Sequence, residues 1–443
     1  MVSSTSVLLA SGSSFSSTQR KQHVQVVEQE VDALLKWKST LTTQNHSLLS
    51  SWKMNSTAST TSPCKWIGII CNNKGSVAEL SLTGLSLQGT LHSFNFSSFT
   101  NFVSLDLSQN QLFETIPSQI SHLTKLTSFD LSSNKFSGHI PPEIGLLTSL
   151  LSLDLSENKI SGSIPQEISN LSLLTDLMLY KNNLAGSLPT SLCNLTNLDV
   201  LAVFENQISG VIPRDIGRLS SLTILALYQN NLNGPVPSSI CNLTNLTRLL
   251  MYENQISGVI PPDIGLLSSL TDLELSANNL SGSIPASLTN LTRLEGLYLY
   301  ENQLSGIIPQ DIGTLTSLRS LDLSKNQISG FVPHEIGNLY FLTDLLLYRN
   351  KLNGSLPNSI CNLTILTSLL IYQNQISGAI PRDIGSLSSL TMLVLYDNNL
   401  SGSIPTSICN LTNLDHLSVF ENSLSDIIPT EIGRLKSLTI LYM

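Results

Sequence analysis

The sequence predicts a right-handed α/β repeat solenoid, with a parallel β-sheet along its concave side and a helical cap at its N-terminal end. Three observations predict it: a 24-residue period over fourteen copies, apolar alternation at the start of each copy, and a differently composed stretch before the first copy. A fixed period of this length is typical of one supersecondary unit stacked on itself. We divide the chain into a degenerate or partial leader at 1–23, a cap at 24–76, a solenoid at 77–437 and the start of a truncated repeat at 438–443.

Three residue types mark the period. A Pro follows the marker Asn by seven places in every copy, and a Gly follows it by four places in twelve copies. Glu114 and Asp426 replace that Gly in the first and last copies. The marker residues, called the ladder Asn below, are Asn110, Asn134, Asn158, Asn182, Asn206, Asn230, Asn254, Asn278, Asn302, Asn326, Asn350, Asn374, Asn398 and Asn422.

Each copy opens with the apolar alternation of a short strand that has one buried face, as at Leu318, Leu321 and Leu323. Strands at a fixed period pair in parallel, about 4.8 Å apart. We expect the ladder Asn to satisfy buried main-chain groups where the chain leaves the strand, with stacked Asn side chains also pairing with one another. The Gly permits a φ that a Cβ would resist, and the Pro fixes an extended segment without needing a donor.

The stretch before the repeats has a different composition. "VEQEVDALLKWKSTL" has helical apolar spacing, with acidic residues early and lysines late, which suits the helix dipole. All three tryptophans of the chain lie here, at Trp37, Trp52 and Trp66. Because the first unit of a solenoid needs a cover for its apolar end, we expect this segment to be that cover.

The repeat unit, L-x-x-L-x-L-x-x-N-x-L-S-G-x-I-P, resembles the plant-type leucine-rich repeat over roughly residues 77 to 443. The stretch "CKWIGIIC" matches the pattern C-x-W-x-G-x-x-C in the N-terminal cap of plant leucine-rich-repeat receptor-like kinases. The resemblance implies a horseshoe-shaped ectodomain with a disulfide between Cys64 and Cys71. It also implies an extracellular peptide or protein ligand, a shorter leucine-rich-repeat co-receptor, and signalling at the cell surface.

The other four cysteines, Cys193, Cys241, Cys361 and Cys409, each lie eleven residues after a ladder Asn. Other copies place Gly, Ser or Thr there, so Cys fills a slot for a small residue. The nearest pairs are two repeats apart, about 10 Å, which is too far for a disulfide. We expect buried free thiols.

Thirteen N-x-S/T sequons occur in the chain, and six of them lie twelve residues after a ladder Asn. Other copies place His122, Arg218 or Arg434 at that position, which indicates a solvent-facing outer surface. Together with a cap disulfide, the sequons favour the secretory pathway. The six predicted glycosylation sites are Asn170, Asn194, Asn242, Asn290, Asn362 and Asn410.

The expected location is the extracellular side of the plasma membrane or the apoplast. The signal sequence is weak, because "MVSSTSVLLASGSS" has no early basic residue and only a short apolar run. No run of eighteen apolar residues occurs, so we expect no membrane-spanning segment in this chain.

No enzyme chemistry is expected. The sequence contains no phosphate-binding loop, no protein-kinase motif and no H-E-x-x-H, and its seven His share no spacing that would gather a metal. A net charge of −9 argues against nucleic acid. We expect no cofactor and no metal. In the family that it resembles, a transmembrane helix and a Ser/Thr kinase domain follow the repeats, so any kinase domain would lie outside this chain.

The position two residues before the ladder Asn points out of the concave sheet. It carries an aromatic residue in nine copies, more than filling the core requires. One interpretation is a self-stacking column that stabilises the sheet. The other is a surface along which a ligand binds, and the resemblance favours it because peptides run along this surface in the receptors. The nine residues are Tyr180, Phe204, Tyr228, Tyr252, Tyr300, Tyr348, Tyr372, Tyr396 and Phe420.

Three basic residues, Arg319, Lys325 and Arg349, occur on two adjacent repeats of an otherwise acidic face. We expect them to form a basic notch that receives a ligand carboxylate, since Arg holds carboxylates bidentately. The predicted ligand-binding set is this notch together with the nine aromatic residues.

Two other functions were weighed. A secreted protein resembling polygalacturonase inhibitors would use a similar concave sheet to block a microbial cell-wall-degrading enzyme, but such proteins carry fewer repeats and a closing cysteine-containing cap. A structural or ice-binding solenoid would favour regular Thr or Ser arrays on a flat face, whereas this face is aromatic and acidic. The ectodomain of a plant receptor-like kinase, or of a receptor without a kinase, is the preferred interpretation.

Overall fold

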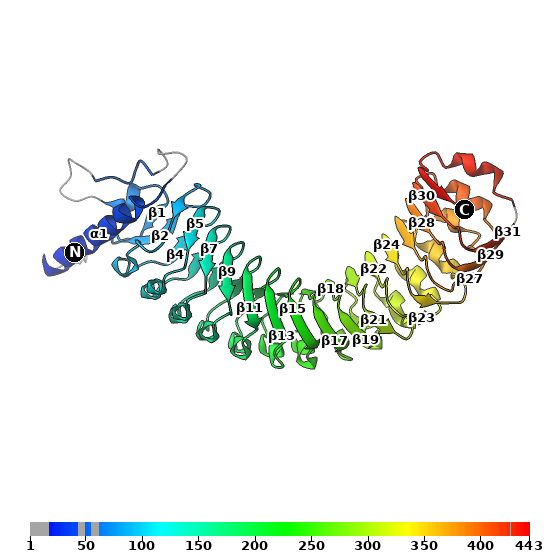
Figure 1. The fold of residues 1–443 in the computed structure, drawn as a ribbon, viewed down its shortest axis with the longest axis horizontal. Coiled ribbons are helices and arrows are strands. Elements are labelled where there is room, and N and C mark those ends of the chain that lie inside the picture. Colours follow the sequence, from blue (N-terminus) through cyan, green and yellow to red (C-terminus); the bar gives the residue numbers. More distant parts are fainter. Residues whose placement is uncertain (1–16, 43–48, 55–61, 426) are drawn as a thin grey trace, which may run out of the picture.

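The computed structural model describes residues 17–42, 49–54, 62–425 and 427–443. The chain forms a curved solenoid with the cap at one end, and its main sheet follows the inner side of the curve (Figure 1). The predicted fold class, a repeat solenoid with a parallel concave sheet, is confirmed. Of the predicted leader, residues 1–16 lie outside the described residues, and 17–23 belong to the first helix.

The concave sheet has 17 strands, of which β2 and the even-numbered strands after it pair in parallel with the next repeat. Their register is constant, because each residue pairs with the one 24 places further on, as Leu177 does with Leu201. The strands of this sheet are β1 Ile69–Cys71, β2 Val77–Ser81, β4 Ser104–Asp106, β6 Ser128–Asp130, β8 Ser152–Asp154, β10 Asp176–Met178, β12 Val200–Ala202, β14 Ile224–Ala226, β16 Arg248–Leu250, β18 Asp272–Glu274, β20 Gly296–Tyr298, β22 Ser320–Asp322, β24 Asp344–Leu346, β26 Ser368–Leu370, β28 Met392–Val394, β30 His416–Ser418 and β32 Ile440–Tyr442.

Strands of two to five residues after the ladder Asn form a second set of parallel sheets, with ten, two and three strands. These strands are β3 Gln88–Gly89, β5 Gln111–Glu114, β7 Lys135–Gly138, β9 Lys159–Gly162, β11 Asn183–Ser187, β13 Gln207–Val211, β15 Asn231–Pro235, β17 Gln255–Val259, β19 Asn279–Ser283, β21 Gln303–Ser305, β23 Ser329–Gly330, β25 Lys351–Leu352, β27 Ser377–Gly378, β29 Asn399–Ser403 and β31 Ser423–Ser425.

A 3₁₀-helical turn follows the Pro of each repeat and returns the chain to the concave sheet. The 3₁₀ turns of the cap and the repeats are η1 Pro63–Lys65, η2 Phe96–Ser98, η3 Ser118–His122, η4 Pro142–Leu146, η5 Gln166–Asn170, η6 Thr190–Asn194, η7 Ile216–Arg218, η8 Ser238–Asn242, η9 Ile264–Leu266, η10 Ala286–Asn290, η11 Gln310–Thr314, η12 His334–Asn338, η13 Asn358–Asn362, η14 Ile384–Ser386, η15 Thr406–Asn410 and η16 Thr430–Arg434. The Leu and Ile positions of strands and turns point inward and form one continuous core.

The ladder Asn makes the same four hydrogen bonds in each of the fourteen repeats. Asn182 Nδ2 donates to the carbonyls of Leu179 (3.2 Å), Tyr180 (3.3 Å) and Leu155 in the preceding repeat (2.9 Å), and its Oδ1 accepts from Ile160 N–H (2.9 Å). The predicted structural role is confirmed. The predicted pairing between Asn side chains is wrong, because both ends of each amide are already taken by main-chain groups.

Two backbone positions of the repeat adopt a left-handed conformation in the part of the chain that the structure describes. The Gly four places after the ladder Asn does so as predicted, as at Gly138 with φ +74°. Glu114 adopts the same conformation without being Gly, at φ +68°. The residue immediately before every ladder Asn is also left-handed, although it is never Gly, as at Glu157 with φ +54°. Local sequence preference does not explain this second position; the hydrogen-bonded Asn that follows holds it there.

The cap covers the N-terminal end of the core. Helix α1, Ser17–Lys38, brings Trp37 within 6.4 Å of Trp52, which stacks on Trp66 at 5.7 Å between ring centroids. Strand β1 pairs antiparallel with β2, so it closes the edge of the parallel sheet. The implied disulfide between Cys64 and Cys71 is present.

We predict that Asn182→Ala destabilises the solenoid, because it leaves the buried Ile160 N–H unpaired and removes one hydrogen bond from each of three carbonyls in two repeats. The free energy of unfolding should fall by about 1–3 kcal/mol. The adjacent Asn183→Ala is the matched control, since the exposed Asn183 side chain makes no hydrogen bond to any described residue. Circular dichroism during denaturant unfolding measures the free energy of unfolding of both variants. Equal midpoints for the two variants would contradict the assigned role of the ladder Asn.

Candidate functional site: the concave face

Three columns of side chains face the concave side of the sheet. They lie six, four and two residues before the ladder Asn, and we call them the first, middle and terminal columns. Because strands alternate their side chains and the register never shifts, each column places a residue beside its counterpart 24 places away. The side chains that line each column of the face can therefore be found by taking every 24th residue of the sequence.

The aromatic residues of the terminal column form two stacks of four rings. Tyr180, Phe204, Tyr228 and Tyr252 stack at 4.3–4.4 Å between centroids, with planes 7–12° apart. Tyr348, Tyr372, Tyr396 and Phe420 stack at 4.5–4.6 Å and 6–12°. All eight rings are half-buried. Because ring faces stack on ring faces along the column, the ring edges and the tyrosine hydroxyls are what face the concave side.

Tyr300 belongs to neither stack. Its neighbours in the terminal column are Ser276 and Ser324, which offer no ring. The expected self-stacking is thus present in two separate stretches, interrupted over the three repeats that contain β18, β20 and β22.

Apolar residues of the middle column lie beside both stacks. Beside the first stack, Ala202, Ala226 and Leu250 form an apolar cluster on the sheet face, separate from the solenoid core. Met178, Val200 and Ile224 pack against this cluster, and so do three rings of the stack, those of Tyr180, Phe204 and Tyr228. Beside the second stack the middle column holds Leu346, Leu370 and Val394. We call each stack with its apolar neighbours an aromatic block.

The five repeats with Ser in the terminal column carry an acidic residue in the middle column. Asp322 shows the arrangement, since its Oδ1 accepts from Ser324 N–H at 2.9 Å and from Ser324 Oγ at 2.6 Å. On this face a repeat therefore carries either an aromatic residue or an acid–Ser pair, and the acid is hydrogen-bonded to the Ser in every pair except Glu274 with Ser276. The acid–Ser pairs are Asp106 with Ser108, Asp130 with Ser132, Asp154 with Ser156, Glu274 with Ser276 and Asp322 with Ser324.

Between the two aromatic blocks, and reaching the first strand of the second block, lies a central acidic segment, which we define as Asp272, Glu274, Asp322 and Asp344. Burial raises the pKa of the Glu274 carboxyl, and the charge of Asp272 adds to that rise. Burial also raises the pKa of Asp322, against the hydrogen bonds from Ser324. This segment was not predicted from the sequence, although the first column shows Asp272 and Asp344, and the middle column shows Glu274 and Asp322, when every 24th residue is compared.

The three residues of the predicted basic notch are placed differently from one another. Arg319 Nε lies 3.1 Å from Glu295 Oε2, at the start of its strand. Lys325 lies six residues further along, past the end of that strand, where its Nζ is 2.9 Å from Glu301 Oε2. Arg349, on the next repeat, donates from Nε to Gln373 Oε1 at 2.7 Å. Lys325 and Arg349 are therefore neighbours at one margin of the sheet, whereas Arg319 lies at the other.

The six sequon asparagines of the shared column are all exposed. Each ends a 3₁₀ turn on the side of the repeat away from the concave sheet, as Asn242 does at the end of η8. The cysteine before four of them is buried and free. Burial raises the pKa of Cys193, Cys241 and Cys361 to about 11 and raises the pKa of Cys409.

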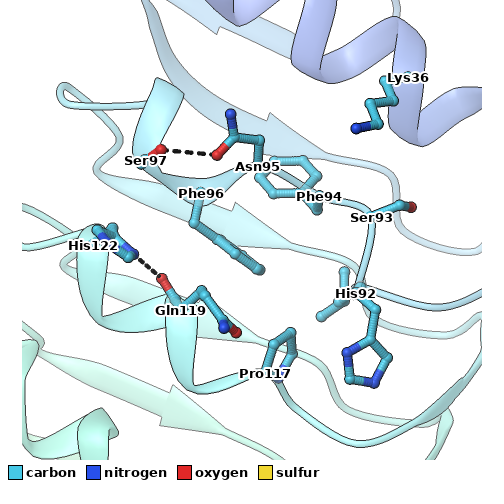
Figure 2. Close-up of a pocket in the computed structure, with 11 residues that line it drawn as sticks. Lys36, His92, Ser93, Phe94, Asn95, Phe96, Ser97, Pro117, Gln119 and His122 are labelled. Carbon is cyan, nitrogen blue, oxygen red and sulfur yellow. Dashed lines mark hydrogen bonds between the residues drawn. The ribbon is translucent and has the colours of Figure 1, made fainter.

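A cavity of about 310 Å³ lies away from the concave columns, between α1 and the turns η2 and η3 (Figure 2). Its polar side chains pair locally: Asn95 Oδ1 accepts from Ser97 Oγ at 2.8 Å, and His122 Nδ1 lies 2.8 Å from the Gln119 carbonyl. Lys36 reaches toward it from the helix (Figure 2). These groups do not converge on one centre, and the described residues include no cluster that could hold a metal ion.

Comparison with known proteins agrees with this architecture. The family model described as the leucine rich repeat N-terminal domain matches residues 27–72, and leucine rich repeat models match 268–328 and seven stretches between 101 and 411. A probable leucine-rich repeat receptor-like protein kinase of Arabidopsis thaliana is 46% identical over 94 residues, which are 21% of this chain and 8% of that protein. The chain thus matches only a small part of that kinase, within its leucine-rich repeats.

Solved structures cover much more of the chain. The PEPR1-AtPEP1 crystal structure matches with a TM-score of 0.81 and 33% identity, over 92% of this chain and 64% of that chain. A plant peptide hormone receptor, RGFR1, in complex with RGF2 matches with a TM-score of 0.69 and 37% identity, over 86% of this chain and 68% of that one.

The chain belongs to the leucine-rich-repeat family. Within that class it is homologous to the ectodomains of Arabidopsis leucine-rich-repeat receptor kinases. Among the described residues, no helix is long and apolar enough to cross a membrane.

We predict that the four buried thiols are unreactive in the folded protein. Because their pKa values are raised, the thiol stays protonated at pH 8 and the nucleophilic thiolate is nearly absent. Ellman's reagent should therefore detect none of the four thiols in the native chain at pH 8 and all four in guanidinium. Rapid native labelling of any of them would contradict the assigned burial.

Proposed function

We propose that this chain is the ligand-recognition domain of a plant cell-surface receptor and that it binds an extended peptide or protein segment along its concave face. The observation that carries the proposal is the pair of aromatic blocks. They place apolar and aromatic side chains outside the core on a face that no other part of the described chain covers. Uncovered apolar patches on soluble domains typically mark binding surfaces. Tyrosine is suited to such a surface because it offers large contact area at low entropic cost.

The structural neighbours support the class of ligand. RGFR1 was solved in complex with RGF2, and the Arabidopsis receptor kinase HAESA was solved in complex with the peptide hormone IDA and the co-receptor SERK1. HAESA matches with a TM-score of 0.59 and 27% identity over 94% of this chain. By homology, the proposed partners are an extracellular peptide or protein and a shorter leucine-rich-repeat co-receptor.

Within this site, Arg349 is the basic residue best placed to receive a ligand carboxylate. Arg319 and Lys325 already contact Glu295 and Glu301, whereas the only side-chain hydrogen bond of Arg349 to a described residue goes to the neutral amide of Gln373. A carboxylate could replace that amide and gain a charge-assisted hydrogen bond. Tyr348, directly before Arg349, would contact the same part of the ligand.

The proposed extracellular location is supported by the cap disulfide and the exposed sequon column. Glycans on that column would project from the side away from the sheet, so they would leave the concave face free.

We predict that glycans occupy Asn170, Asn194, Asn242, Asn290, Asn362 and Asn410 in the protein secreted from plant cells. Enzymatic deglycosylation in heavy-oxygen water, followed by peptide mapping, marks each occupied Asn as labelled Asp. An unoccupied column, with label only at other sequons such as Asn245 and Asn279, would contradict the placement of the glycans.

We predict that Tyr348→Ala and Arg349→Ala each weaken ligand binding by more than about 1 kcal/mol, roughly fivefold in Kd, with little change in melting temperature. Peptides selected on the wild-type chain from a random displayed library serve as the probe, and calorimetry measures their affinity. Tyr340→Ala and Arg293→Ala are matched controls, since both side chains are exposed in turns outside the three columns.

Unchanged affinity together with a lowered melting temperature for Tyr348→Ala would assign the aromatic column to stability alone. Failure of the library to yield any binding peptide would contradict the proposed function.

A further inference from the structure

At the centre of the concave face, where the aromatic column is interrupted, the ring of Tyr298 has charged neighbours. Strand β20 carries Gly296 in the first column and Tyr298 in the middle column. A Cβ added to Gly296 would lie 2.7 Å from Tyr298 Cε2, so the ring lies back along its own strand over the glycine. A residue with a side chain in place of Gly296 would push the ring out of this position.

Carboxylates lie beside this ring on the adjacent strands. In the middle column Glu274 and Asp322 pair in register with Tyr298, one on each side. In the first column Asp272 pairs with Gly296, and Asp272 Oδ1 lies 3.3 Å from where the glycine Cβ would be. Three of the four carboxylates of the central acidic segment thus lie on the two strands that flank one tyrosine.

Basic side chains of the protein leave much of this charge uncompensated. Arg248 Nε is 3.8 Å from Asp272 Oδ2, and Lys325, which acts on Asp322, already contacts Glu301. Among the described residues, Glu274 makes no hydrogen bond and no ion pair within 4 Å, and Arg248 is the basic residue whose charge acts on it. A cation supplied from outside would therefore meet an unpaired carboxylate, a second carboxylate and a tyrosine ring.

Apolar residues lie at equal distances on both sides of this ring. Leu250 and Tyr252 end the first aromatic block two strands before β20, and Leu346 and Tyr348 begin the second block two strands after it. Two strand spacings are about 9.6 Å, which is close to three residues of an extended chain at about 3.3 Å per residue.

We propose that the central acidic segment and Tyr298 form a subsite for a Lys or Arg side chain of the bound segment. The segment would carry an apolar residue about three places before and about three places after that cation, one for each aromatic block. The inference rests on the proposed function and narrows its ligand class to an extended segment with a cationic centre and apolar flanks. The charge of the subsite, its unpartnered Glu274 and the two flanking apolar surfaces each match one feature of this ligand.

The test uses a random twelve-residue peptide library displayed on phage and selected on the wild-type chain. Selected peptides should be enriched in Lys or Arg with apolar residues three places away on either side. The double variant Glu274→Gln with Asp322→Asn should weaken their binding at least about tenfold, because charge-assisted contacts to the cation are lost. Both substitutions keep the side-chain shape, and the amide oxygen introduced at position 322 would still accept from Ser324.

The matched control is Glu167→Gln with Asp311→Asn, which removes the same charge from exposed positions on η5 and η11. It should leave the affinity unchanged, which separates a local contact from long-range attraction. Tyr298→Leu tests the ring and should weaken cationic peptides more than neutral ones.

Two results would overturn the inference. The first concerns selected peptides that lose affinity with Tyr348→Ala. If these peptides show no Lys or Arg enrichment, or if they bind the double variant as tightly as the wild type, the subsite is contradicted and the proposed function stays intact. Peptides insensitive to every concave-face substitution would contradict the proposed function and the subsite together.

Discussion

The rest of this solenoid depends on the hydrogen bonds that one Asn side chain per repeat makes to the main chain. Each amide joins its own turn to the turn of the preceding repeat, through a carbonyl on one side and an N–H on the other, as Asn182 does with Leu155 and Ile160. These bonds satisfy polar groups that would otherwise be buried unpaired. They also disfavour an insertion between Leu155 and Ile160, because an added residue there would separate the two groups that the Asn182 amide bonds. The constant period of 24 residues keeps the same bonds in all fourteen repeats.

A constant register makes the concave face a set of straight columns. Rings two residues before the ladder Asn can stack because neighbouring strands bring them to 4.3–4.6 Å, within the range of aromatic stacking. The same register keeps Glu274 and Asp322 on either side of Tyr298. Each repeat carries either an aromatic residue in the terminal column or an acid–Ser pair, and the acid is hydrogen-bonded to its Ser in every pair except Glu274 with Ser276. The order of these two kinds of repeat determines the pattern of the surface.

Much of the structure was predictable from the sequence, because a repeating sequence shows the same structural constraint in every copy. The period, the inward Leu positions, the Gly conformation, the cap and the outward aromatic column all follow from residue spacing. The hydrogen-bond partners of the ladder Asn could not be predicted, since an Asn offers the same donors and acceptor to another amide as to the main chain. The left-handed conformation of the residue before the ladder Asn could not be predicted either, because Glu, Lys and Gln give no local sign of that conformation. Arg319 and Lys325 were grouped by repeat alone, although strand β22 lies between them.

The central claim is that ligand binds on the concave face, and a glycan placed there tests it most directly. Ser368→Asn with Leu370→Thr creates a sequon on β26, beside Tyr372, whereas Thr314→Asn creates one at the position that six native sequons share. A glycan is bulky, so it excludes a partner from the surface that carries it. With occupancy confirmed by mass spectrometry, peptides selected on the wild-type chain should not bind the first variant and should bind the second with unchanged Kd. Equal binding to both glycosylated variants would contradict the account.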